Sequence, residues 1–298
     1  MSAVSHLGRE QLADIRAREP DRVGRAWTER GRRPLLGPDG RLLVVAADHP
    51  ARGALGVRGD AMAMASRTDL LERLAIALAR PGVDGVLGTA DVLDDLLLMG
   101  ALEGKVVIGS MNRGGLQGAV FELDDRFTGY DAPAIVAHGL EGGKMLTRIA
   151  LDDPGTAPTL EASARAVTEL AAAGRMALVE PFLSVVEHGR VRNLLDPDSV
   201  IRSVHIASGL GASSAHTWLK LPVVAELDRV MDATTLPTLL LGGDPHGHPD
   251  DTFASWGDAL DIPAVRGLVV GRALLYPQDG DVAAAVDVAA NLVHGGAR

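Results

Sequence analysis

The sequence predicts an α/β protein, namely a (β/α)8 TIM barrel preceded by a short N-terminal helical extension. Apolar runs of strand length alternate with segments of helical periodicity, and eight such pairs recur about every 30 residues. Ionisable residues gather where the apolar runs end, which is where the chemistry of such barrels is found. The chain has 298 residues, enough for one large α/β domain.

The extension is predicted to cover residues 1–38. Within it, residues 5–31 show apolar side chains spaced among many charged ones, which indicates helical structure. Pro34 and the Gly-Pro-Asp-Gly turn at 37–40 then end the helical pattern. The barrel domain is predicted to occupy residues 39–298.

Each predicted strand is a short apolar run, suited to a strand that is buried on both faces. The predicted strands are 42–47, 85–88, 106–109, 144–149, 176–180, 217–220, 237–242 and 267–271. The helices are predicted at 68–80, 90–102, 133–139, 160–173, 197–208, 223–231, 250–260 and 282–293. A doubly wound open sheet is the alternative, but no Gly-x-Gly-x-x-Gly follows the first strand to favour dinucleotide binding.

Composition argues against several classes of function. A net charge of −10 disfavours nucleic acids and anionic membranes as partners. Without cysteine there is no thiolate catalysis and no Cys-ligated metal. We expect no secretory leader and no membrane-spanning segment, because no suitable apolar run is present. A cytoplasmic homo-oligomer that acts on a small molecule is therefore expected.

Lysine is rare in this chain, so its positions are informative. There are three lysines, Lys105, Lys144 and Lys220, against 26 arginines. Lys220 ends an apolar run just before Leu221 and Pro222. Unlike a guanidinium, an amine can lose its proton and attack a carbonyl carbon to form a Schiff base. The alternative is a lysine that extends from a strand end into solvent.

Three further ionisable residues lie on predicted strands or at their ends. Glu180 stands among apolar neighbours before a proline, a suitable setting for a general acid/base. Asp48 follows the first strand, and Lys144 lies on the fourth, two strands before that of Lys220. If Lys144 points into the barrel, its charge would favour a neutral neighbouring amine. Helix capping or ion pairing for the carboxylates, and helix packing for Lys144, are the alternatives.

Glycines follow the last two strands. In TIM barrels these two loops often bind phosphate, because small residues let backbone N–H groups approach the anion. Arg272 would add a charge-assisted contact, although ordinary turns would also explain the glycines. The residues predicted to bind substrate or phosphate are Gly242, Gly243, Gly271, Arg272, Arg148, Asn112 and Arg113.

A tract after the seventh strand carries alternating possible metal ligands. Asp244, His246 and His248 could bind zinc, joined by His49 or His216. The tract is rich in proline and glycine and lies beyond the strand, where side chains are poorly fixed. We therefore predict no metal.

Several short motifs occur in the order found in a known family. They are Asp48 with Arg52-Gly53-Ala54-Leu55, Lys144-Met145-Leu146, Val179-Glu180-Pro181, Leu219-Lys220-Leu221-Pro222, Gly242-Gly243 and Val270-Gly271-Arg272-Ala273. The chain resembles class I aldolases of the tagatose-bisphosphate and sulfofructose-phosphate type, relatives of deoxyribose-phosphate aldolase, and an actinobacterial group of aldolase-like barrels. The first-strand motif is longer than the family pattern, which leaves Arg52 without an assigned role. The segment 112–132 matches no pattern and is interpreted as a substrate-selecting lid.

The resemblance implies a metal-independent aldolase without a cofactor. Lys220 would form the Schiff base, Glu180 would move protons, Lys144 would lie beside them and Asp48 would orient a hydroxyl. The implied substrate is a phosphorylated ketose or keto-sugar acid. One candidate is deoxy-keto-gluconate phosphate, cleaved to dihydroxyacetone phosphate and malonate semialdehyde. The alternatives are a non-catalytic sugar-phosphate-binding barrel and a metal-dependent lyase or hydrolase that uses His246 and His248.

Overall fold

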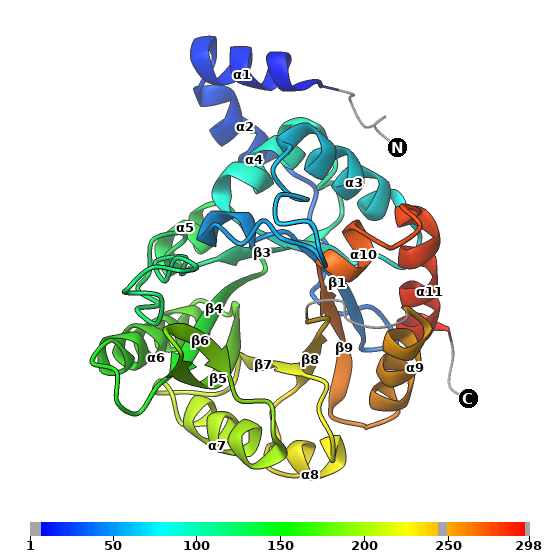
Figure 1. The fold of residues 1–298 in the computed structure, drawn as a ribbon. Coiled ribbons are helices and arrows are strands. Elements are labelled where there is room, and N and C mark those ends of the chain that lie inside the picture. Colours follow the sequence, from blue (N-terminus) through cyan, green and yellow to red (C-terminus); the bar gives the residue numbers. More distant parts are fainter. Residues whose placement is uncertain (1–6, 244–248, 296–298) are drawn as a thin grey trace.

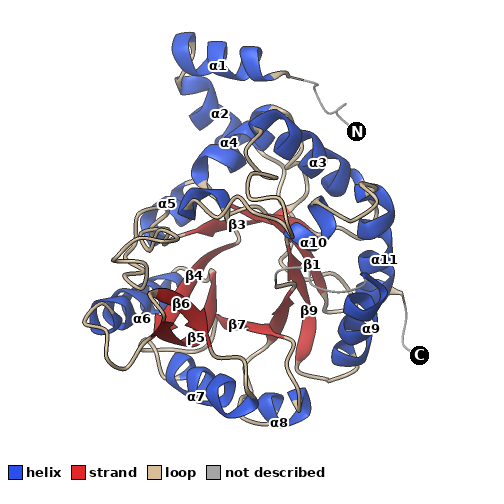
Figure 2. Cartoon of the chain, in the orientation of Figure 1, coloured by secondary structure: helices blue, strands red, loops and turns tan. Residues whose placement is uncertain are grey.

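The structure is a computed structural model and describes residues 7–243 and 249–295. Eight parallel strands form a closed barrel with helices around it, so the predicted TIM barrel is confirmed (Figures 1 and 2). The barrel strands are β1 (Leu42–Ala46), β2 (Gly85–Gly88), β3 (Val106–Ser110), β4 (Gly142–Ile149), β5 (Met176–Glu187), β7 (Thr217–Pro222), β8 (Thr238–Leu241) and β9 (Val265–Val270). Neighbouring strands pair in the order β4-β3-β2-β1-β9-β8-β7-β5, and a β4–β5 ladder closes the ring.

Helices follow the barrel strands and cover their outer faces (Figure 2). They are α3 (Arg67–Ala79), α4 (Ala90–Leu98), α5 (Ala132–Ala137), α6 (Thr156–Ala172), α7 (Pro197–Ser208), α8 (Leu227–Met231), α9 (Pro249–Leu260), α10 (Arg272–Leu275) and α11 (Val282–His294), with a short 3₁₀ turn η1 (Pro50–Arg52). Side-chain caps define several starts: Ser66 accepts from the N–H of Asp69, and Asp196 accepts from that of Ser199. None of the described helices is both long and apolar enough to cross a bilayer.

The apolar residues separate into an outer and an inner layer. The outer layer packs strands against helices and includes Leu43, Val45 and Val179. The inner layer fills the barrel with alternate strand residues: Leu42, Val44, Ala46, Leu87, Val106, Ile108, Met176, Leu178, Trp218, Leu239 and Val269. Since side chains alternate along a strand, this layer shows which later residues of each strand also point inward.

One element was not predicted. β5 continues past Pro181 to Glu187 and turns back as β6 (Arg190–Asn193), forming an antiparallel hairpin. The sequence pattern predicts that this strand ends at 180, because proline cannot donate a hydrogen bond to a ladder. In the structure β5 pairs with β7 only as far as Val179, so Pro181 lies where that ladder has already ended.

The extension forms two helices, α1 (Arg9–Arg18) and α2 (Asp21–Glu29), that pack on the barrel domain beside α4 (Figure 1). Trp27 is buried, and its indole N–H donates to Asp94 Oδ1 at 2.8 Å. The predicted helix at 223–231 is also shorter, because Glu226 has a left-handed φ of 53° and α8 starts only at Leu227.

Candidate active site

The inner face changes from apolar to charged near the C-terminal ends of the strands. On β5, Met176 and Leu178 belong to the inner apolar layer, so Glu180 also points inward. On β7, Trp218 belongs to the inner layer, so Lys220, two residues later, points inward as well. Lys144 lies opposite Leu178 in the β4–β5 register and therefore shares its face. Lys144 therefore points into the barrel, which is the first of the two alternatives that the sequence left open.

Glu180 joins the two lysines. Its Oε2 lies 2.5 Å from Lys144 Nζ, and its Oε1 lies 2.9 Å from Lys220 Nζ. Lys144 Nζ is also 3.2 Å from Asp48 Oδ2, which in turn lies 2.9 Å from Arg113 Nη2. The four residues predicted to be catalytic therefore form one connected cluster, with Arg113 at its end.

The cluster is almost completely buried. The side chains of Lys144 and Asp48 are each 2% exposed, that of Lys220 is 4% and that of Glu180 is 10%. Buried charges are stable only when they are paired and hydrogen-bonded, and here each charge has at least one opposite partner. Lys220 and Glu180 are slightly more exposed than the other two members of the cluster.

Pairing determines the charge states of the cluster. Burial would raise the pKa of Glu180, but the ammonium groups of Lys144 and Lys220 outweigh it and lower that pKa to about 2. Burial and the guanidinium of Arg113 lower the pKa of Lys144 to about 8, against the opposing effect of Asp48 and Glu180. Burial opposes ionisation of Asp48 too, yet Arg113 and Lys144 hold its pKa well below the usual range. Both carboxylates are therefore ionised at neutral pH.

Two more residues lie at the cluster without having been predicted as part of the site. Ser110, the last residue of β3, donates from Oγ to Asp48 Oδ2 at 3.2 Å. His49 Nδ1 lies 3.8 Å from Asp48 Oδ1, and its side chain is 28% exposed. Burial lowers the pKa of His49 to about 3; Asp48 opposes this effect, and Arg272, Lys220 and Arg113 add to it. Because Val106 and Ile108 point inward, strand alternation could have predicted that Ser110 points inward too. The sequence pattern suggested His49 only as a metal ligand.

Arg148 and Asn112 both make hydrogen bonds or ion pairs to other residues of the protein. Arg148 is buried and pairs with Asp125, with Nη2 2.6 Å from Oδ1 and Nε 2.9 Å from Oδ2. The Asn112 amide donates to the carbonyl oxygen of Asp125 at 3.0 Å, and its Oδ1 accepts from the N–H of Leu146 at 2.8 Å. Both residues therefore fasten the segment 112–132 to β4.

Arg52 fastens the same segment to the loop after β1. Its Nε donates to the carbonyl oxygen of Gly115 at 2.9 Å, and Nη2 lies 3.7 Å from Glu122 Oε1. These contacts give Arg52 a structural role that the resemblance had left open. Arg113 is the member of this segment whose side chain reaches the lysine cluster.

The residues of the predicted anion site lie after β8 and β9, which are neighbours in the barrel. A Cβ on Gly271 would lie 2.4 Å from the carbonyl oxygen of Ala46, so only glycine fits there. Gly243 has a φ of +64° with open space around its Cα, and Gly242 precedes it. Arg272 Nη1 lies 3.5 Å from the carbonyl oxygen of Gly56. Anion binding at these four residues stays a prediction.

The possible metal tract lies outside the described residues, since Asp244, His246 and His248 fall in the gap at 244–248. In the described ranges, no group of three or more His, Asp or Glu side chains is arranged to hold a metal. His216 precedes β7, at the end of the barrel opposite to His49, so these two histidines cannot share an ion.

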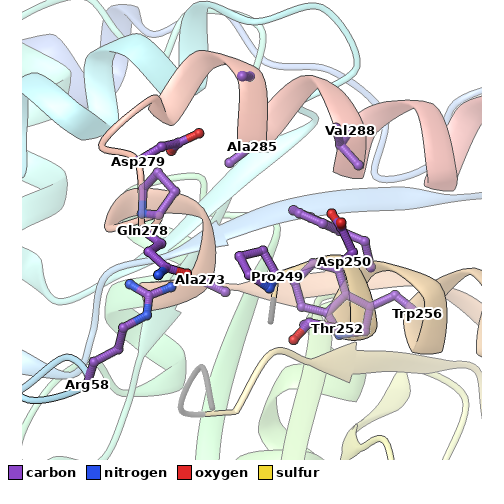
Figure 3. A pocket seen from close by; sticks show the side chains of 13 residues that line it. Arg58, Pro249, Asp250, Thr252, Trp256, Ala273, Gln278, Asp279, Ala285 and Val288 are labelled. Atoms are coloured by element: carbon purple, nitrogen blue, oxygen red, sulfur yellow. The ribbon is translucent and has the colours of Figure 1, made fainter. Parts of the chain in front are cut away.

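A separate pocket of about 600 Å³ lies between α9, α10 and α11. Figure 3 shows Arg58 on one side of it, with Trp256 and Val288 on the other. Arg58 is tied to α10 because its Nη1 donates to the carbonyl oxygen of Tyr276 at 2.7 Å. The lysine cluster contributes no side chain to this pocket, so the two sites are distinct.

A closed (β/α)8 barrel with these charged side chains at its mouth defines the class of protein as a TIM barrel. The chain belongs to the Cgl0159-like family, whose profile matches residues 40–290. The crystal structure of Cgl0159 from Corynebacterium glutamicum (Brevibacterium flavum) is 60% identical and has a TM-score of 0.95, over 98% of this chain and 99% of that one.

More distant structures share the fold. An archaeal fructose 1,6-bisphosphate aldolase is 18% identical with a TM-score of 0.64, over 92% of this chain and 100% of that one. A fructose-bisphosphate aldolase from Slackia heliotrinireducens is 16% identical with a TM-score of 0.61, over 95% and 92%. No curated protein matches the chain. The broader likeness to aldolases is therefore supported at the level of fold, and the narrower tagatose-bisphosphate or sulfofructose-phosphate type stays a prediction.

Proposed function

We propose that this protein is a class I aldolase that cleaves a carbon–carbon bond of a phosphorylated ketose or keto-sugar acid through a Schiff base on Lys220. One observation carries the proposal: the carboxylate of Glu180 lies between two buried lysine amines at the C-terminal mouth of the barrel. A lysine nucleophile needs an adjacent group to move protons and a second charge to tune it. The cluster supplies both.

In the proposed reaction, the neutral amine of Lys220 attacks the carbonyl carbon of the substrate. The carbonyl oxygen takes up a proton, and the carbinolamine then loses water to give an iminium ion. The iminium accepts the electron pair of the breaking carbon–carbon bond, while the hydroxyl on the departing fragment loses its proton and becomes an aldehyde. Protonation of the resulting enamine at carbon and hydrolysis release the second product and restore the amine.

Glu180 is the group that we assign to these proton transfers. Its Oε1 is 2.9 Å from Lys220 Nζ, within direct reach of the amine and of the oxygen that leaves the carbinolamine. Lys144 contacts the other carboxylate oxygen and can hold Glu180 in place during turnover. Asp48 is assigned to a substrate hydroxyl, because it is ionised and lies on the far side of Lys144.

The phosphate of the substrate is assigned to the loops after β8 and β9. Gly243 is exposed with open space around its Cα, Gly242 precedes it and Gly271 directly follows the neighbouring strand, and we assign Arg272 to add charge. Deoxy-keto-gluconate phosphate, cleaved to dihydroxyacetone phosphate and malonate semialdehyde, is the candidate substrate that we would test first. The resemblance of the chain to aldolases supports this choice.

Reductive trapping tests the proposal. The protein is incubated with borohydride and a panel of ketoses that includes dihydroxyacetone phosphate, fructose 1,6-bisphosphate and deoxy-keto-gluconate phosphate. We expect a covalent mass increase and loss of activity in the wild type and in Lys105→Arg, and no mass increase in Lys220→Arg. Lys105 is a matched control, because its amine donates to the carbonyl oxygen of Val83 at the opposite end of the barrel. If no ketose is trapped although sugar phosphates bind, the non-catalytic barrel is the better account.

A further inference from the structure

Beside the lysine cluster lie two polar atoms that have no hydrogen-bond partner among the described residues, Asp48 Oδ1 and His49 Nδ1. Asp48 uses only one carboxylate oxygen for pairing: Oδ2 accepts hydrogen bonds from Ser110 Oγ and Lys144 Nζ, each at 3.2 Å, and forms an ion pair with Arg113 Nη2 at 2.9 Å. In the described ranges no donor lies within hydrogen-bond distance of Oδ1, and the nearest nitrogen is His49 Nδ1 at 3.8 Å. Nδ1 is itself buried and has no hydrogen-bond partner there.

A buried nitrogen without a partner, as in His49, is unusual, because buried polar groups are normally satisfied. At the other end of the cluster both oxygens of Glu180 are paired. The imidazole of His49 also lies close to Gly271, which directly follows β9. A Cβ on Gly271 would lie 3.5 Å from His49 Cε1, so the imidazole sits between Asp48 and the end of β9.

The charges around His49 decide which hydrogen bonds it can make. The nearby cations Arg272, Lys220 and Arg113, together with burial, keep the imidazole neutral. A neutral ring has one N–H and one bare nitrogen. Because Nδ1 faces an ionised carboxylate, the tautomer with the proton on Nδ1 is favoured. The pair therefore offers an acceptor, Asp48 Oδ1, beside a donor, the Nδ1–H of His49.

We propose that Asp48 Oδ1 and His49 Nδ1 together bind one hydroxyl group of the substrate, which donates to the carboxylate and accepts from the imidazole. An oxygen can lie about 2.8 Å from both atoms, given their separation of 3.8 Å. His49 is thus a substrate-binding residue that selects for a hydroxyl, while Asp48 Oδ2 stays committed to Lys144.

The position of the pair indicates which hydroxyl this is. Asp48 is linked to Lys220 through Lys144 and Glu180, and the Lys220 ammonium is one of the charges that lower the pKa of His49. On this chain of contacts we place the hydroxyl near the carbon that bonds to Lys220. Resting on the proposed Schiff-base function, the inference narrows the substrate class to α-hydroxyketones that carry phosphate, and it disfavours ketones or aldehydes without that hydroxyl.

Two ketones that differ by this one hydroxyl test the inference. Dihydroxyacetone phosphate has it, and hydroxyacetone phosphate lacks it. The measured quantity is the concentration that gives half-maximal borohydride trapping. For the wild type we expect a value about 10- to 100-fold lower with dihydroxyacetone phosphate, the range of a hydrogen bond to a charged group.

Three variants separate recognition from structure. In His49→Phe, which keeps a planar ring without polar atoms, the preference should fall below about 3-fold. In His49→Asn, whose amide can place a donor near the position of Nδ1, the preference should stay above about 5-fold. His205→Asn, on the exposed side of α7, should behave as the wild type. Unchanged far-ultraviolet circular dichroism and melting temperature show that each variant is folded.

If His49→Phe keeps the wild-type preference for dihydroxyacetone phosphate, the inference is overturned. It is also overturned if His49→Phe raises the half-maximal trapping concentration of both ketones by the same factor. If the wild type traps neither ketone, calorimetric binding of the same two compounds decides. A His49-dependent preference in binding would then uphold the hydroxyl site while the Schiff-base function fails. Equal affinities, or no binding of either compound, would overturn the hydroxyl site as well.

Discussion

Strand β4 connects two buried ionic networks at opposite ends of the barrel, and they are built differently. At the bottom, Glu141 lies just before β4, and its Oε1 is 2.9 Å from Arg32 Nε. Its Oε2 accepts from the backbone N–H of Val107 at 2.8 Å and lies 3.3 Å from Arg30 Nη2. At the mouth, three residues further along, Lys144 contacts two carboxylates, and Lys220 shares one of them.

The choice of cation distinguishes the two networks. Arginine stays protonated in proteins and makes several hydrogen bonds in a fixed geometry, so it suits an ion pair with a structural role. Arg30 also donates to the carbonyl oxygens of Lys105 and Gly139, which ties the N-terminal extension to the bottom of the barrel. Lysine can give up its proton, and both lysines of the mouth lie beside a carboxylate that can receive one. The bottom network therefore holds the fold together, and the mouth network is suited to chemistry.

Exchanging the two cations should give the largest contrast. Lys220→Arg is expected to lower turnover at least about 1,000-fold, because a guanidinium cannot act as the nucleophile. Arg30→Lys should leave turnover within about 2-fold but lower the free energy of unfolding by about 1–3 kcal/mol, because it loses hydrogen bonds to backbone carbonyls. Steady-state kinetics and urea unfolding measure the two effects. An active Lys220→Arg would contradict the division between the networks.

The two glutamates allow the same comparison. Glu180→Gln should lower kcat by about 100- to 10,000-fold, because the amide cannot transfer protons. Glu141→Gln should leave kcat nearly unchanged and cost about 3–5 kcal/mol of stability, the loss expected when one partner of a buried ion pair is removed. A Glu180→Gln variant with normal kcat would remove Glu180 from the reaction.

Only one of the two networks is expected to titrate near neutral pH. The pKa of Lys144 is about 8 in the folded protein, below its usual 10.5. Between these values the unfolded chain binds more protons, so the free energy of unfolding should rise with pH, by up to about 3 kcal/mol. Lys144→Met should remove the contribution of Lys144 and leave that of Lys105, whose pKa is also lowered by burial, whereas Arg30→Lys should retain both. Urea unfolding from pH 7 to 10.5 tests this, and a rise of undiminished size in Lys144→Met would contradict it.

Charge at the anion site should have a smaller effect. Arg272→Ala is expected to raise KM about 10- to 100-fold with a lesser change in kcat, because phosphate contacts mostly supply uniform binding. Arg266→Ala is the matched control, since Arg266 is exposed near the start of β9, at the other end of the strand that precedes Arg272. A fall in kcat with KM unchanged would show that Arg272 does not bind the ground state.

Chelation should have no effect at all. A Schiff-base mechanism needs no divalent metal, so we expect EDTA to leave turnover unchanged within error. Activity that is lost with EDTA and restored by zinc would favour the metal-dependent alternative.

Much of the mouth could be predicted because its residues lie on regular strands. The inward direction of Glu180 and Lys220 follows from strand alternation, and their closeness follows from the rule that the ends of barrel strands converge. Arg148 shows the limit. Its partners Asp125 and Glu122 belong to an irregular segment whose path no periodicity fixes, so the sequence could not reveal these ion pairs. Substrate binding by Arg148 stays a prediction.

The extension of β5 shows a second limit. Pro181 indicates the end of a strand by local rules, yet the structure continues, because the pairing of β5 with β7 has already ended at Leu219. The neighbouring strand that pairs with a given residue is determined by the closed barrel, so local sequence rules cannot predict it. The link between Arg30 and Glu141 is of the same kind, since 111 residues separate the partners.

The most direct test of the Schiff-base mechanism is the position of the trapped label. After borohydride reduction with the best ketose phosphate of the panel, the protein is digested and the modified lysine is identified by peptide mass mapping. We predict the label on Lys220, with Lys144 and Lys105 unmodified. A label on Lys144 would show that the nucleophile lies on β4 instead of β7, and would contradict the roles assigned to both lysines.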